Sequence, residues 1–542
     1  MVSNGSDYGR ANIEPDLGFP TDAWVRHRAR FLDPRAAVKA PGEPELRQTA
    51  YVADTLLVRG ADDPETFDTL QRVARASGFF AKRREEESHR DLLERADLTS
   101  EQKAELSKIW VERVRLVPHR EHDGLVRPED AWHILQAYRY AMGESPRNTD
   151  VALEHLVTTT AEGIGGAPYT KSHPYTKSHV PGGVPYTKSH GLAQYAVPGL
   201  GGRQPVNWIG PAPLARYPLD GSEEVRRPVV AVLDTGVGAH PWLDDGHVLR
   251  GLEVGKVPLD IPPSSPGSET EGTSDPLLGM LDPDAGHGTF IAGLLRQACP
   301  DATVLAVRLF HGDGVVGEWD LLRALQLLAV RHLLAVNGDS AYEVVDVLSL
   351  SLGYYHEQPS DVAYSSLLRE WLRLLGRYGV AVVASAGNDA TVRRMYPGAF
   401  SSEQDPEVVP VVCVGAENPD KSVALFSNGG PWVGYLRPGA ALVSCHPKTF
   451  DGSDEPGVEV TYAGQYRTTI DVDDFSSGFA VWSGTSFAAP VFAGELARGL
   501  LERYVAGDDD KDPKVARTRV RDVLAAMPKD SRPKTSGRGG PR

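Results

Sequence analysis

The run Val229-Val-Ala-Val-Leu-Asp-Thr-Gly-Val237 gives the clearest indication of the fold of this chain. It begins with a continuous β-branched and aliphatic run, which is typical of a strand buried on both faces of a sheet. Asp234 follows at the carboxyl end of the strand, and Gly236 lets the chain turn away at once. Because chemistry in parallel α/β sheets gathers at this edge, Asp234 is a candidate functional carboxylate. Taken alone, a turn or N-cap aspartate is the simpler interpretation.

Similar apolar runs recur between about Pro228 and Val505, and helical stretches lie between several of them. The helical pattern is clearest over residues 321–336 and 362–378. This alternation predicts an α/β fold with a doubly wound parallel sheet. The further strands are expected at Thr303–Arg308, Val345–Leu350, Val380–Ser385 and Val409–Val414.

Two more motifs built from small residues lie downstream of Asp234. His287 stands in Gly286-His-Gly-Thr289, where flanking glycines let the imidazole project from the start of a helix. Ser486 stands in Ser483-Gly-Thr-Ser-Phe-Ala-Ala-Pro490 and opens another helix, whose dipole and free amides favour a developing oxyanion. An aspartate, a histidine and a serine can serve as orienting group, general base and nucleophile.

Asn388, in Ser385-Ala-Gly-Asn388, follows a buried strand. Its side-chain amide can donate a hydrogen bond to a tetrahedral oxyanion, although a turn residue would read the same way. Taken together and in this order, the motifs resemble those of the subtilase family, the subtilisin-like serine proteases of peptidase class S8. The resemblance implies that Asp234, His287 and Ser486 form the catalytic triad and that Asn388 is the oxyanion donor.

The resemblance covers about Pro228 to Val505, roughly half of the chain. It implies a serine endopeptidase that acts on polypeptides through an acyl-enzyme intermediate. One segment resembles the strand that pairs with extended substrate, and another resembles the opposite wall of the S1 pocket. The substrate-binding residues that this implies are Ser351, Leu352, Gly353, Ala386 and Gly387.

The chain also departs from the family pattern. Phe487 stands where many subtilases carry methionine, and two long insertions, at about Leu252–Ala285 and Pro447–Gly478, flank the expected cleft. No acidic pattern identifies the calcium sites that many subtilases carry. We therefore expect no metal site and no required cofactor, with calcium possible but unsupported.

A mixed α and β pattern occupies residues 46–160. Its order of strand and helix resembles the ferredoxin-like propeptide of subtilisin-like proteases, so a zymogen whose N-terminal domain inhibits the cleft intramolecularly is one interpretation. An unrelated regulatory or partner-binding domain is the other. Strands are expected at Tyr51–Arg59, Val111–Val117 and Val151–Val157, and helices after Asp63, over 82–109 and after Pro128.

The remaining boundaries follow composition. Residues 1–45 read as an irregular N-terminal arm and 161–215 as a Gly/Pro-rich linker, in which the hexapeptide PYTKSH occurs three times. A metal site on the repeat histidines His173, His179 and His190 is a minor alternative. The catalytic domain is expected over 216–506, followed by a charged, disordered tail over 507–542.

Composition sets the expected compartment and partners. The 542 residues carry a formal net charge of -16, which argues against a global electrostatic hold on nucleic acid. No apolar run approaches a membrane span and no secretory pattern is seen at the start, so we expect no membrane partner. The three cysteines, expected as small buried hydrophobes, do not suggest a disulfide framework, and a cytoplasmic protein is the expectation.

Two other function classes stay open from the sequence. One is a subtilase fold kept as a peptide-binding or scaffold protein with little turnover. The other is an effector protease that a partner recruits and that stays silent until triggered. An active serine endopeptidase regulated by its N-terminal domain is the main prediction.

Overall fold

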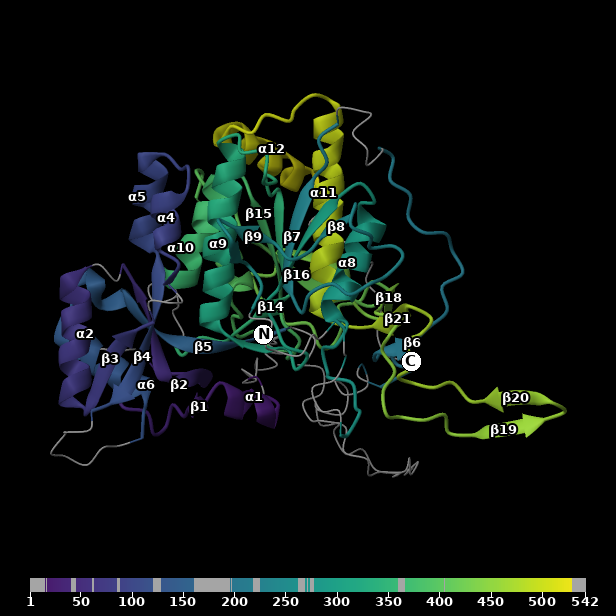
Figure 1. Cartoon of the computed structure of the whole chain (residues 1–542), viewed down its shortest axis with the longest axis horizontal. Coiled ribbons are helices and arrows are strands. Elements are labelled where there is room, and N and C mark those ends of the chain that lie inside the picture. The colour runs from purple at the N-terminus through teal and green to yellow at the C-terminus, as the bar shows by residue number, and fades with distance from the viewer. Residues whose placement is uncertain are drawn as a thin grey trace, which may run out of the picture.

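The computed structural model (Figure 1) describes residues 15, 17–39, 45–60, 63–84, 88–119, 128–159, 195, 197–217, 225–261, 269–270, 272, 277–358, 366–403 and 405–528. The three PYTKSH repeats with their histidines lie outside these residues. Among the described helices, none is both long and apolar enough to cross a bilayer.

A seven-stranded parallel sheet forms the core of the second half of the chain, with strand order β17-β16-β15-β13-β7-β11-β8. All its strand pairs are parallel, so the predicted doubly wound parallel sheet is confirmed. The strands are β7 (Val229–Asp234), β8 (Val248–Leu249), β11 (Thr303–Arg308), β13 (Val347–Leu350), β15 (Ala381–Ser385), β16 (Val412–Glu417) and β17 (Tyr435–Pro438).

Helices cover both faces of this sheet (Figure 1). Successive residues of a strand point to opposite faces. Accordingly, Ala231 and Leu233 of β7 join the apolar cluster of the α9 and α10 side, whereas Val230 and Val232 join the cluster of the α8 and α11 side. The bounds are α8 (His287–Ala298), α9 (Glu318–Val336), α10 (Ser366–Arg377) and α11 (Thr485–Val505).

Short strands and one hairpin complete this domain. The hairpin β19–β20 projects away from the body of the molecule (Figure 1), and its eight residues are all exposed. The bounds are β6 (Gln204–Pro205), β9 (Glu253–Val254), β10 (Val257–Pro258), β18 (Leu442–Cys445), β19 (Glu459–Tyr462), β20 (Gln465–Thr468), β21 (Phe479–Trp482) and the 3-10 helix Gly398–Ser402.

The N-terminal region forms an α+β domain whose antiparallel sheet has the order β5-β2-β4-β3. Helices α2 and α6 pack on one face of that sheet. The elements are β2 (Thr49–Arg59), α2 (Pro64–Ala76), β3 (Phe79–Arg83), α4 (Asp91–Arg95), α5 (Ser100–Ile109), β4 (Val111–Pro118), α6 (Ala131–Met142), the 3-10 helix Pro146–Thr149 and β5 (Val151–Thr159).

The sequence missed β3 and treated the charged stretch over 82–109 as one helix. The structure instead has a short edge strand that ends in Lys82 and Arg83, and two separate helices after it. A capping box at Thr99 starts the second of these helices. The charged end of the strand concealed its pairing with β4, which is set by a remote segment.

The outer boundaries differ from the predicted ones. The arm over 1–45 is not irregular throughout, because it contains α1 (Thr21–Arg26) and β1 (Ala29–Leu32), and β1 adds to β2 as an antiparallel strand. The linker over 161–215 is also shorter than predicted. Its last part contributes β6 to β21, and the half-buried Arg203 there donates hydrogen bonds to three main-chain carbonyl groups.

The tail over 507–542 is not disordered throughout. It contains α12 (Pro513–Ala526), which begins with Asp512 as its capping residue. Val520 and Leu524 lie four residues apart on this helix and are buried in the cluster that also holds Tyr504 of α11. Apolar residues on one helix face therefore outweigh the charged composition. Residues 529–542 lie outside the described part.

Candidate active site

The structure brings Asp234 and His287 together. Asp234 ends β7 at the carboxyl edge of the sheet, and His287 is the first residue of α8. His287 Nδ1 lies 2.7 Å from Asp234 Oδ1, and the two side chains are at most 1% exposed. Gly286 precedes the helix with a φ of 86°, a backbone conformation that favours glycine. The imidazole is therefore held by Nδ1, which leaves Nε2 for chemistry.

Ser486 lies in the first turn of α11, next to Thr485. The main-chain N–H and the hydroxyl of Thr485 both donate to Asn388 Oδ1, each at 2.9 Å. This fixes the amide of Asn388, so that its Nδ2 points away from Thr485. An ideal Cβ placed on Gly484 would lie 2.7 Å from Ser486 Oγ and 3.5 Å from Asn388 Nδ2. Both groups thus border the same small space.

Four buried polar atoms of this site have no hydrogen-bond partner within the described part of the chain. They are Asp234 Oδ2, His287 Nε2, Asn388 Nδ2 and Ser486 Oγ. Buried polar atoms are rarely left unpaired, and those that are need an explanation. A nucleophile, a base and an oxyanion donor that wait for a substrate give one.

Electrostatics favour a basic His287. Burial alone would lower the pKa of His287, but the carboxylate of Asp234 outweighs it and holds the pKa above its ordinary value. Asp284 and Glu269 act in the same direction. Two aromatic rings, Trp482 and Phe487, pack against the imidazole with centroids at 5.7 and 5.1 Å. The site is thus shielded from water on that side.

The expected substrate strand adjoins the nucleophile. Ser351 Oγ donates to the main-chain carbonyl of Ser486 at 2.7 Å, and Leu352–Gly353 form β14. This strand pairs with β5 of the N-terminal domain, with Leu352 opposite Thr159 and Gly353 opposite Thr158. A strand that the sequence did not identify, β12 (Val315–Gly317), pairs antiparallel with β5 as well.

The other expected wall residues, Ala386 and Gly387, lie directly after β15. Asn428 joins them, because its Nδ2 donates to the carbonyl of Ala386 and its N–H donates to the carbonyl of Gly387, both at 2.9 Å. Gly387 N–H donates to Thr485 Oγ1 at 3.0 Å. This wall is therefore tied to the start of the nucleophile helix.

Two carboxyl groups beside the triad were missed by the sequence analysis. Glu269 Oε1 lies 2.5 Å from the hydroxyl of Thr235, and burial raises its pKa to about 8. Asp284 Oδ2 accepts a hydrogen bond from Thr159 Oγ1 at 2.6 Å, and burial raises its pKa to about 6. Both lie in the long acidic insertion, whose composition gave no sign of buried acids.

Within the described part of the chain, no group of three metal-ligating side chains includes a residue of the triad. Asp451, Asp471 and Asp473, at the base of the β19–β20 hairpin, have oxygens within 4.8 Å of one another, but such acidic groups are common without an ion. Calcium therefore remains a matter of prediction. The three cysteines are free and buried, as predicted.

Comparisons of the sequence with known proteins find serine proteases. The family model described as Peptidase S8, Subtilase family, matches residues 226–510. The thermophilic serine proteinase of Bacillus sp. (strain AK1) is 28% identical over 269 residues, which cover 49% of this chain and 51% of that protein. The intracellular serine protease of Paenibacillus polymyxa is 25% identical over 325 residues, which cover 57% of this chain and 77% of that protein.

Among solved structures, fervidolysin from Fervidobacterium pennivorans, a keratinolytic enzyme related to subtilisin, is 19% identical with a TM-score of 0.42. That match covers 89% of this chain and 60% of that chain. The present chain thus spans about half the length of the Bacillus relative and a larger share of the other two proteins.

Proposed function

This chain belongs to the subtilase family, and we propose that it is a serine endopeptidase that cleaves polypeptides with Asp234, His287 and Ser486. The family match spans all three motifs. The observation that carries the proposal is the set of unpaired buried atoms, in which His287 Nε2, Ser486 Oγ and Asn388 Nδ2 await partners. A scaffold protein would have no need to keep these polar atoms unpaired.

The proposed reaction begins with proton transfer. His287 Nε2 takes the proton of Ser486 Oγ as the oxygen attacks the substrate carbonyl carbon. Asp234 bonds the Nδ1 side of the ring at 2.7 Å, so the imidazolium that forms faces a carboxylate. The raised pKa of His287 fits a base that must hold this proton briefly.

The negative charge on the substrate oxygen then needs a donor. Asn388 Nδ2 is free for it, since Asn388 Oδ1 already accepts two hydrogen bonds from Thr485. Preorganised donors of this kind contribute about 10²–10³ in turnover. His287 next gives its proton to the leaving amine, and water hydrolyses the acyl-enzyme bond at Ser486 Oγ.

The test is the Ser486→Ala variant beside the wild type, assayed on a casein-type substrate and with a fluorophosphonate probe. We expect the wild type to be labelled at Ser486 and the variant to lose both labelling and hydrolysis. Equal hydrolysis by both proteins would contradict the assignment. A wild type that neither hydrolyses casein nor reacts with the probe, even after removal of the N-terminal region, would favour the scaffold alternative.

The N-terminal domain is proposed to inhibit this site by occupying the cleft as a substrate would. The end of β5 pairs antiparallel with both β12 and β14, and Thr159 N–H donates to the carbonyl of Gly314 at 2.9 Å. Thr159 also bonds Asp284, which lies three residues before His287. An extended segment in this position blocks access of polypeptide substrates to Ser486.

A broad contact supports the docking of this domain. The sheet face opposite α2 and α6 packs on α9, and α5 lies against α10 (Figure 1). Trp110 and Trp371 meet edge to face with ring centroids 5.7 Å apart. The main-chain N–H of Val111 donates to Gln326 Oε1 at 2.8 Å. Apolar packing and satisfied polar groups together are typical of a specific interface.

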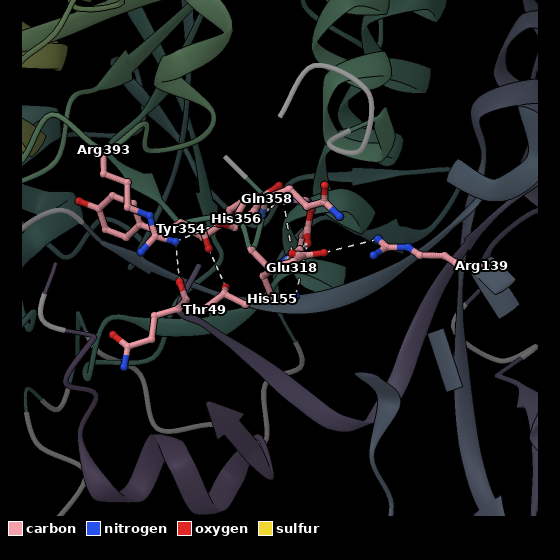
Figure 2. A network of polar contacts seen from close by, with 11 residues as sticks. Thr49, Arg139, His155, Glu318, Tyr354, His356, Gln358 and Arg393 are labelled. Atoms are coloured by element: carbon pink, nitrogen blue, oxygen red, sulfur yellow. Dashed lines mark hydrogen bonds and ion pairs between the residues drawn. The ribbon is translucent and has the colours of Figure 1, made fainter. Parts of the chain in front are cut away.

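A buried polar network joins the two domains next to β14 (Figure 2). His155 of β5 lies between two carboxylates of the catalytic domain, with Nδ1 2.7 Å from Glu318 Oε2 and Nε2 2.9 Å from Glu357 Oε2. Tyr354, which follows β14, stacks on the His155 ring at 4.7 Å. Arg139 of α6 faces Glu357 at 3.5 Å. The docking of β5 thus carries a charged contact as well as strand pairing.

A further inference from the structure

Glu269 occupies an unusual position behind the triad. Its carboxyl group is buried, with Oε1 2.5 Å from the hydroxyl of Thr235 and Oε2 bonded to the hydroxyl of Thr289. Thr235 directly follows Asp234, and Thr289 lies two residues after His287. One carboxyl group therefore contacts both motifs that carry the base and its orienting acid.

Each of the two threonine hydroxyls also accepts a hydrogen bond from the segment that carries the other threonine. The hydroxyl of Thr235 accepts the N–H of Gly288, which lies on the His287 helix, at 2.8 Å. The hydroxyl of Thr289 accepts the N–H of Gly238, which lies on the Asp234 turn, at 2.8 Å. Each hydroxyl thus bonds across the gap between the segments, and its own proton is left for Glu269.

Resting on the proposed function, we propose that Glu269 is a positioning residue for the reaction, which holds the Asp234 turn against the start of the His287 helix through the hydroxyls of Thr235 and Thr289. The side chain fits this role closely. The Cγ methylene of Glu269 would lie 3.4 Å from a Cβ placed on Gly236. The main-chain carbonyl oxygen of Glu269 would lie 2.7 Å from a Cβ placed on Gly238. Both glycines leave the space that it fills.

The protonation state of Glu269 should change the hydrogen bonds that Asp234 accepts. Thr235 Oγ1 lies 3.3 Å from Asp234 Oδ1, the oxygen that faces His287. When Glu269 is ionised, the Thr235 hydroxyl donates to Glu269. When Glu269 is protonated, its carboxyl proton can be donated to the Thr235 hydroxyl oxygen. The Thr235 hydroxyl then donates its own proton to Asp234 Oδ1, where it competes with the hydrogen bond from His287. Ionised Glu269 therefore makes Asp234 the better acceptor for His287.

Burial, with smaller effects of charged neighbours, places the ionisation of Glu269 in the neutral to alkaline range. Burial is the main cause that raises the pKa of Glu269 to about 8, Asp234 raises it further, and His287 opposes the rise. Burial lowers the pKa of Arg203, and Glu269 acts against that shift. At His287, where Asp234 outweighs burial, Glu269 adds to the rise of the pKa. As pH rises through about 8, the ionised carboxylate adds negative charge beside the base.

The experiment uses full-length protein with Glu269 changed to Gln or Leu. The rate of fluorophosphonate labelling at Ser486 is measured from pH 6 to 10 and normalised to the count of reactive sites, so that access to the cleft is common to all variants. Glu269→Gln keeps polar contacts to both threonines but cannot ionise. Glu269→Leu has similar size and no hydrogen bond.

We expect Glu269→Leu to label about tenfold more slowly at saturating probe, with an unchanged half-saturating concentration. The wild-type profile should show a second inflection near pH 8 that Glu269→Gln lacks. Superimposed profiles of wild type and Glu269→Gln would overturn the proposal, as would wild-type labelling by a folded Glu269→Leu. If the Leu variant does not fold, the Gln profile alone decides. A wild type that is never labelled, even after removal of the N-terminal region, defeats the proposed function instead, because Glu269 is intact in it.

Discussion

Two buried histidines, His287 and His155, make the most informative comparison in this molecule. Each ring has Nδ1 2.7 Å from a carboxylate oxygen, that of Asp234 for His287 and that of Glu318 for His155. They differ at Nε2. In His287 it has no partner among the described residues, whereas in His155 it lies 2.9 Å from Glu357.

The difference assigns the two rings different work. A neutral imidazole has one N–H, so a ring with carboxylates at both nitrogens must carry a second proton to donate twice. His155 is accordingly a buried cation: burial lowers its pKa, but Glu318 and Glu357 outweigh burial and raise the pKa to about 9. His287 keeps one nitrogen open and can accept a proton during a reaction.

The largest expected effect comes from removing His287, the ring whose Nε2 has no partner among the described residues. We expect His287→Ala to lower hydrolysis by a factor on the order of 10⁴ or more, because His287 is the proposed general base for Ser486. His155→Gln, which changes the other buried histidine, should leave the chemistry intact. Initial rates on a small peptide substrate, per folded protein, measure both. Equal losses in the two variants would contradict the separate roles.

The second effect concerns pH. His155 has an ordinary pKa of 6.5 and one of about 9 when docked. Its contribution to docking is thus fully present below pH 6.5 and is lost as pH rises through about 9. The other charged groups near the His155 ring are Glu318, Glu357 and Arg139. Burial lowers the pKa of the neighbouring His356 to about 4, so that ring is neutral at pH 7.

We therefore expect inhibition by the N-terminal domain to weaken by about 10² between pH 7 and pH 10, the equivalent of a shift of 2.5 pKa units less the part already lost at pH 7. The ratio of fluorophosphonate labelling rates of His155→Gln and wild type cancels the titration of His287. That ratio should fall toward one at high pH. A ratio that stays constant from pH 7 to pH 10 would refute the role of His155.

The smallest effect tests the strand pairing next to this network. Thr159→Pro removes the N–H that donates to Gly314 and should raise the initial rate on a small peptide substrate about tenfold, since one ladder bond is lost and the local backbone is disturbed. Thr158→Val is the control, because it keeps the main chain and removes only a weak hydroxyl contact of 3.4 Å to Gly353. Identical rates for wild type and Thr159→Pro would argue against an occupied cleft.

The sequence predicted the parts of the site that local motifs encode. Asp234, His287 and Ser486 each need glycine or another small residue beside them, so their surroundings are legible in the sequence, and the parallel sheet follows from its buried apolar runs. Glu269 and His155 carry no such motif. Their partners lie far along the chain, as with His155 and Glu357, which are 202 positions apart.

Composition misled the sequence analysis where a few contacts outweigh it. The segment with α12 is charged, yet its Val520 and Leu524 are buried in the apolar cluster of the catalytic domain. The linker is rich in glycine, yet Arg203 donates to three carbonyls of the catalytic domain. In both places specific contacts of individual residues order a segment, and composition averages over such residues.

Intact-mass analysis of purified wild type beside Ser486→Ala, followed over time, tests the central claim most directly. We expect that only the wild type is cut and that the cut falls within the first peptide bonds after Thr159, because β5 runs along the expected substrate strand up to that residue. A wild type that stays whole and is not labelled by a fluorophosphonate at any pH from 7 to 10 would contradict it, as would the same cut in Ser486→Ala.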